Sequence, residues 1–142
     1  MQKLILSLFL VTIFVTFSEQ KLVVQGVLQK WALLIDPYVS KCVRQTGIDR
    51  EIFLSTFRRG EFPDEACFKC TLKCLATEQN FMDNVGNFNS ELIVKKVYGV
   101  TEEIVKMCEQ SQTPDICQRA YDFAVCAFSS IGGQIPWNDK KV

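Results

Sequence analysis

The sequence predicts an all-helical (all-α) protein fastened by disulfide bonds, and three observations support this fold class. Apolar residues recur at helical spacing through most of the chain, and no alternating strand pattern extends beyond a few residues. Turn-forming residues divide this pattern into about six short helices with short links. The chain also carries seven cysteines, a density typical of secreted domains that depend on disulfides.

Residues 1–18 have the pattern of a secretory signal peptide. A short basic start ends at Lys3, and Leu4–Phe17 is a nearly unbroken apolar run that is too short to span a membrane comfortably. Small residues such as Ser18 suit a cleavage site after it. We therefore expect residues 1–18 to be removed, leaving residues 19–142 as one domain. No later segment reaches about 18 consecutive apolar residues, which predicts a soluble mature chain without stable membrane association.

The first helix of the mature chain is expected to consist of two pieces. Its apolar face carries Leu28, Trp31, Leu34 and Tyr38. Asp36-Pro37 interrupts this face, because the residue before a proline avoids the helical region, whereas proline suits a first helical turn. We therefore expect a junction near Asp36 and a helix end around Gly47.

Five further helices are expected, separated by capping and turn residues. Asp49 caps a helix that closes at Gly60, and a third helix occupies about residues 65–79, followed by an asparagine-rich loop to Asn89. The inward-facing residues of these two helices are Ile52, Phe53, Phe57, Phe68, Leu72 and Leu75. The remaining helices are expected to begin at Ser90, at Thr101 and at Asp115, and to end near Gly99, Thr113 and Gly132-Gly133 respectively.

The composition excludes several classes of function. The chain contains no histidine, which removes Ser-His and Cys-His catalysis, histidine metal sites and a histidine pH switch. Loss of Lys3 with the signal peptide leaves a formal charge of −1. No basic stripe indicates nucleic acid or an anionic membrane as a partner. We therefore expect no catalytic residue, no metal site and no cofactor.

Six of the seven cysteines form a set with informative spacing. They are Cys42, Cys70, Cys74, Cys108, Cys117 and Cys126, separated by 27, 3, 33, 8 and 8 residues. If residues 115–129 form one helix, Cys117 and Cys126 lie about 13 Å apart along it. That exceeds the roughly 7 Å that a disulfide tolerates, so these two do not pair with each other. The remaining connectivities stay open.

The cysteine spacing and the residues around it resemble the insect odorant-binding protein family, in its six-cysteine pheromone-binding and general odorant-binding type. The resemblance extends over the whole mature chain, and besides the cysteines it rests on Trp31, Pro37, Thr46-Gly47, Phe62-Pro63, Gly86, Asn89, Asp115 and Ala120-Tyr121. It implies short helices around an apolar cavity. It also implies the disulfide pairs Cys42–Cys74, Cys70–Cys117 and Cys108–Cys126.

Cys67 departs from the family pattern. With Cys70 it forms a CxxC motif, but no strand pattern precedes the motif, and neither a second such motif nor a histidine occurs in the chain. These absences argue against redox and zinc chemistry. We expect Cys67 to be a free, buried thiol.

The resemblance also implies which residues surround a ligand, whereas apolar stripes alone are typical of a packed core. The expected lining residues are Phe53, Phe57, Leu72, Leu75, Ala76, Phe81, Leu92, Val97, Tyr98, Tyr121, Ala124, Phe128 and Trp137. The polar groups are expected to be the two tyrosine hydroxyls and the indole N–H of Trp137. Trp137 lies in a tail that is expected to fold back over the cavity from a hinge at Gly132-Gly133.

The resulting hypothesis is a secreted, non-enzymatic carrier, found in sensillum lymph, that binds small hydrophobic ligands and transports them to a membrane chemoreceptor. The ligands would be odorants, pheromones or related volatiles and lipids, and the carrier a monomer or weak homodimer. The alternative is a disulfide-rich secreted effector, of venom, saliva, seminal fluid or immunity, that acts by contact. The strongly cationic or amphipathic surface typical of such effectors is not evident in this sequence.

Overall fold

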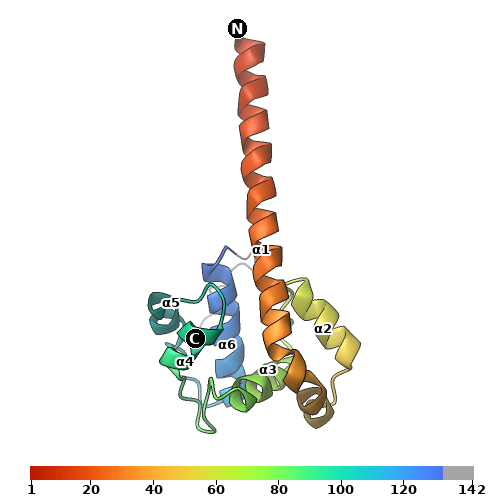
Figure 1. Cartoon of the computed structure of the whole chain (residues 1–142), viewed down its shortest axis with the longest axis vertical. Helices are drawn as coiled ribbons and strands as arrows, with labels where there is room; N and C mark the ends of the chain where they lie inside the picture. The colour runs from red at the N-terminus through yellow and green to blue at the C-terminus, as the bar shows by residue number, and fades with distance from the viewer. Residues whose placement is uncertain (133–142) are drawn as a thin grey trace.

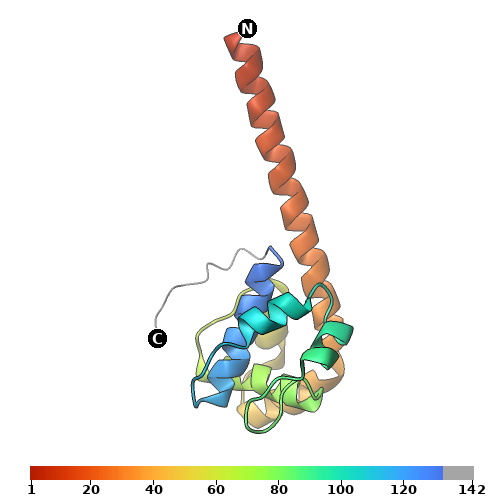
Figure 2. The ribbon, with the colours of Figure 1, turned by 90° about the vertical axis from the view of Figure 1, so that its left-hand side faces the viewer.

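The helices form a small body from which one long helix projects (Figures 1 and 2). The computed structural model describes residues 1–132, without the side chains of residue 12 and residues 14–24. This part of the chain contains no β-strand and six helices, as predicted: α1 (Gln2–Thr46), α2 (Arg50–Arg58), α3 (Ala66–Glu78), α4 (Ser90–Lys96), α5 (Glu102–Cys108) and α6 (Ile116–Ser130). Of the described residues, no helix is long and apolar enough to cross a membrane.

Helix α1 continues through Pro37, so the predicted junction near Asp36 is wrong. Pro37 cannot donate to the carbonyl of Leu33, a loss that costs about 3 kcal/mol or more in a helix interior. The Leu33 side chain is 70% exposed and Pro37 is exposed, so water can reach this carbonyl. The opposite side of the helix is anchored before and after the proline by the buried residues Trp31, Ile35 and Val39. Their burial offsets the lost hydrogen bond.

Capping residues fix the helix ends. Asp49, Asn89, Thr101 and Asp115 each accept a hydrogen bond from a backbone N–H in the first turn of α2, α4, α5 and α6 respectively. Gly47 ends α1 in the left-handed region with φ of 78°, where glycine is the favoured residue. The predicted end of the first helix and the predicted Asp49 cap are therefore confirmed.

Aromatic rings fill the centre of the core. The rings of Phe53 and Phe68, both fully buried, have centroids 5.2 Å apart, and Phe62 lies between Phe68 and Phe128 at 6.0 and 5.5 Å. Ile52, predicted to face inward, is instead 62% exposed. Since successive helical residues point about 100° apart, the burial of Phe53 turns its neighbour toward solvent.

Three disulfide bonds in the described chain connect the helices. Cys42–Cys74 joins α1 to α3, Cys70–Cys117 joins α3 to α6, and Cys108–Cys126 joins α5 to α6. The Cα–Cα distances are 5.6, 4.6 and 5.5 Å, within the range that a disulfide requires. These are the pairs that the family resemblance implies. One turn of α3 is thereby attached to two other helices.

Cys67 is a free thiol, but it is exposed rather than buried as predicted. It lies in the first turn of α3, beside the exposed residues Glu65 and Ala66. The buried stripe of this helix begins one residue later, at Phe68. Helix α3 therefore starts at the surface, and Cys67 lies outside its buried face.

Alkylation should detect this thiol in the native protein. Iodoacetamide without denaturant should add one label per chain, at Cys67, because the thiol is accessible and the other cysteines are paired. Intact mass and peptide mapping would measure the labelling, with Cys67→Ser as the unlabelled control. Labelling that requires denaturation would contradict the exposed position.

Candidate functional site

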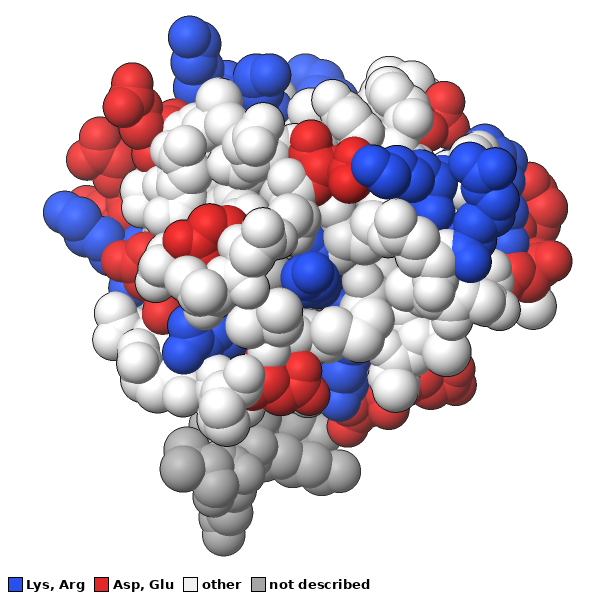
Figure 3. Space-filling view, turned by 90° about the horizontal axis from the view of Figure 1, so that it is seen from below, with Lys and Arg blue, Asp and Glu red and all other residues white. Residues whose placement is uncertain are grey.

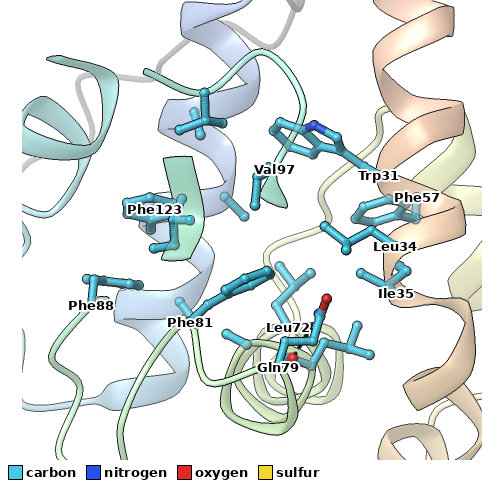
Figure 4. Close-up of a pocket in the computed structure, with 17 residues that line it drawn as sticks. Trp31, Leu34, Ile35, Phe57, Leu72, Gln79, Phe81, Phe88, Val97 and Phe123 are labelled. Atoms are coloured by element: carbon cyan, nitrogen blue, oxygen red, sulfur yellow. Dashed lines mark hydrogen bonds between the residues drawn. The ribbon is translucent and has the colours of Figure 1, made fainter. Parts of the chain in front are cut away.

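An apolar cavity lies inside the helical body, between α1, α3, α4 and α6 (Figure 4). Its volume is about 110 Å³. A cavity of roughly 10–15 Å³ holds one water molecule, so this one has room for a small organic molecule. The wall comprises 17 residues: Trp31, Leu34, Ile35, Phe57, Leu72, Leu75, Ala76, Gln79, Phe81, Phe88, Ile93, Val97, Val100, Ala120, Phe123, Ala124 and Ala127.

Three helices each present a stripe of residues at i, i+3 and i+4 to the cavity. Helix α1 supplies Trp31, Leu34 and Ile35, helix α3 supplies Leu72, Leu75 and Ala76, and helix α6 supplies Ala120, Phe123, Ala124 and Ala127. This spacing places the side chains of each stripe on one face of its helix. Three of the four α6 residues are alanines, which leave space that larger side chains would fill.

The loop over residues 80–89 contributes two aromatic rings. Phe81 is buried, and Phe88 stacks on Phe123 with ring centroids 4.4 Å apart. The carboxylate of Asp83 organises this loop by accepting hydrogen bonds from the backbone N–H groups of Val85 and Asn87 and from the Asn87 side-chain amide, at 2.8–2.9 Å. The hydrogen bonds from Asn87 are the main reason that the pKa of Asp83 lies below its usual value of 3.8.

The wall is almost wholly apolar, and none of its 17 residues is ionisable. The indole N–H of Trp31 donates to the backbone carbonyl of Tyr98 at 2.8 Å. The side-chain amide nitrogen of Gln79 donates to the carbonyl of Leu75 at 3.0 Å. The Gln79 side-chain oxygen is buried and has no hydrogen-bond partner among the described residues. The side-chain oxygen of Gln79 is therefore the polar atom of the wall that can still accept a hydrogen bond.

Seven of the predicted lining residues lie in the wall: Phe57, Leu72, Leu75, Ala76, Phe81, Val97 and Ala124. Five lie outside it, and Trp137 is outside the described residues. Phe53 and Phe128 belong to the buried core, and Leu92 is partly buried against that core. Core and cavity wall share the same helical stripes, which is why periodicity does not separate them.

The two tyrosines predicted to supply hydroxyl groups point elsewhere. Tyr98 is 53% exposed, and the ammonium of Lys30 lies 3.5 Å from its ring centroid. The hydroxyl of Tyr121 donates to the backbone carbonyl of Phe62 at 2.6 Å. Burial raises the pKa of Tyr121, as do the carboxylates of Asp64 and Asp122 to a smaller extent, so the hydroxyl keeps its proton. Neither tyrosine lines the cavity.

Ten wall residues are absent from the sequence prediction: Trp31, Leu34, Ile35, Gln79, Phe88, Ile93, Val100, Ala120, Phe123 and Ala127. Helical spacing from Ala124, which the sequence analysis does name, would have found Ala120 and Ala127. Gln79 lies one turn beyond Leu75 and Ala76 on the same face. Because its side chain is polar, a pattern of apolar residues does not include it.

An all-helical body braced by disulfides around an apolar cavity is the class of structure that these observations define. The family model described as the PBP/GOBP family matches residues 27–130, and the chain belongs to this pheromone-binding and general odorant-binding family. The solved structure of Apis mellifera odorant binding protein 5 is similar, with a TM-score of 0.57 and 28% identity. That similarity covers 71% of this chain and 88% of the other. A search of curated proteins found no match.

The loop beside the cavity should respond to acid through Asp83. Since the folded state lowers the pKa of this group, its stabilising effect is present above about pH 3.8 and is lost as the pH falls through the folded-state pKa. Asp83→Ala should therefore lower the melting temperature at neutral pH, and the difference from the wild type should close in strong acid. Thermal unfolding between about pH 7 and 2 would measure this difference. An undiminished difference in strong acid would contradict the assignment.

Proposed function

We propose that this protein is a secreted carrier that binds small hydrophobic ligands in the cavity between α1, α3, α4 and α6. The observation that carries the proposal is the apolar wall, in which Gln79 offers the one unused polar group among the described wall residues. Burying apolar ligand surface there is favourable by about 25 cal/mol per Å². A charged metabolite would lose its hydration without gaining an ion pair. Membership of the PBP/GOBP family supports the same function.

The biological setting extends this proposal. The ligands would be odorants, pheromones or related volatiles and lipids, carried through an extracellular fluid such as sensillum lymph to a membrane chemoreceptor. The similarity to a honeybee odorant binding protein supports that setting. The protein would act without catalysis, as a monomer or weak homodimer. On the face viewed along the long axis from the end opposite the N-terminus, charges of both signs are scattered among uncharged residues (Figure 3).

Residues 1–18 are proposed to be a signal peptide and residues 19–142 the mature domain. The start of α1 projects from the helical body, and its large apolar side chains from Leu4 to Val11 are exposed (Figure 2). The family match begins only at residue 27. Both observations support a segment that serves secretion rather than the cavity.

Filling the cavity should weaken ligand binding. Ala124 lines the cavity and is half-buried, so Ala124→Phe should weaken binding of the uncharged fluorophore N-phenyl-1-naphthylamine by about tenfold or more. Ligand entry would then require overpacking, which typically costs about 1–3 kcal/mol. Fluorescence titration would measure the affinity.

The matched control for this substitution is Ala66→Phe. Ala66 is an exposed alanine at the start of α3, and it does not line the cavity. This variant should bind the fluorophore with wild-type affinity. Equal loss of affinity in both variants, or no loss in either, would count against the cavity as the binding site. Circular dichroism would confirm that both variants keep their helical content.

A further inference from the structure

We propose that Gln79 makes the cavity selective for alcohols, that is, for uncharged ligands whose polar end donates a hydrogen bond. Ligands of the same size whose oxygen can only accept, such as ethers, esters and ketones, would bind more weakly. This inference rests on the proposed carrier function and specifies the ligand class that the cavity prefers.

Gln79 is placed to contact a ligand inside the cavity. It follows α3 directly as its C-terminal cap, and only 8% of the residue is exposed. Figure 4 shows its side-chain oxygen directed into the space between Phe81 and Ile35. That oxygen has no partner among the described residues. A ligand that occupies the cavity therefore meets an unpaired carbonyl oxygen.

The orientation of the Gln79 amide follows from its hydrogen bond. The amide nitrogen lies 3.0 Å from the carbonyl oxygen of Leu75 and donates to it. Exchanging the nitrogen and oxygen would bring two oxygens together, and each of them can only accept. The backbone of α3 therefore holds the nitrogen, and the oxygen is the end that faces the cavity.

The chemistry of the wall then discriminates among ligands. A buried acceptor without a partner loses its hydration, and a ligand hydroxyl restores a hydrogen bond to it. An ether or ester oxygen cannot donate, so it leaves the oxygen of Gln79 without a hydrogen bond. The other polar group in the wall, the indole N–H of Trp31, already donates to the carbonyl of Tyr98. Among the described wall residues, the polar atom without any partner is thus the acceptor oxygen of Gln79.

The test compares ligands of equal size on the wild-type protein. Calorimetric titration with 1-octanol and with methyl heptyl ether, which have the same number of non-hydrogen atoms, should show about tenfold tighter binding of the alcohol. Gln79→Met keeps a long, unbranched side chain but removes the acceptor. It should reduce the preference for the alcohol to within about twofold, mainly by weakening alcohol binding.

Gln110→Met is the matched control. Gln110 lies just after α5 and also donates its side-chain amide to a carbonyl four residues earlier, that of Lys106, at 2.6 Å, but it is exposed and lies outside the cavity wall. This variant loses the same type of hydrogen bond and should keep the full preference for the alcohol.

The outcomes separate this inference from the proposed function. Equal affinities of the wild type for the two ligands would overturn the proposed selectivity. A preference for the alcohol that persists in Gln79→Met would overturn it as well. Either result would still be compatible with a carrier of apolar ligands. If the wild type binds neither ligand, nor the uncharged fluorophore, the proposed function itself fails. The comparison of the two ligands on the wild type needs no variant, so it tests the selectivity even if Gln79→Met does not fold.

Discussion

The attachment of α3 to α1 and α6 through Cys74 and Cys70 is the constraint on which the cavity depends. Helices that bury apolar stripes tend to pack until no space remains, and an unfilled cavity costs about 24 cal/mol per Å³. In the chain-entropy model, bridges with sequence separations of 32, 47 and 18 residues each stabilise the fold by about 3–4 kcal/mol. That contribution to the stability of the fold is large enough to offset the cost of a cavity of about 110 Å³ in so small a protein.

Polar groups in this interior are arranged so that few remain unpaired. The buried hydroxyl of Thr71 bonds to the Cys67 carbonyl and lies 2.7 Å from the Thr46 hydroxyl, which joins α3 to α1. Tyr121 and Trp31 likewise donate to backbone carbonyls on other segments. These hydrogen bonds fix the positions of the elements around the cavity. The oxygen of Gln79 is the exception among the described residues, and it lies in the cavity wall.

The sequence predicts the helical elements well because each has a local cause. Asp49 and Asp115 cap helices through short-range hydrogen bonds, and Gly47 ends α1 by its left-handed conformation. The error at Pro37 has a tertiary cause. Burial of the residues on the opposite face of α1 outweighs the local tendency of proline to interrupt a helix. The cavity is harder to predict: whether a stripe residue such as Phe53 or Phe57 lines the cavity depends on helix packing that one sequence does not specify. Tyr121 shows the same limit for polar groups, because its hydroxyl pairs with the carbonyl of Phe62, which is distant in the sequence.

Methyl-resolved NMR would show directly whether the cavity receives the ligand. The oxidised protein would be titrated with 1-octanol while the methyl signals of Leu75, Ala124 and Ala127 in the wall are compared with those of the exposed residues Leu33 and Ile52. If the ligand occupies the cavity, saturable shifts should appear at the wall methyls and none at the exposed ones. Shifts concentrated at Leu33 and Ile52, or shifts that never saturate, would contradict it.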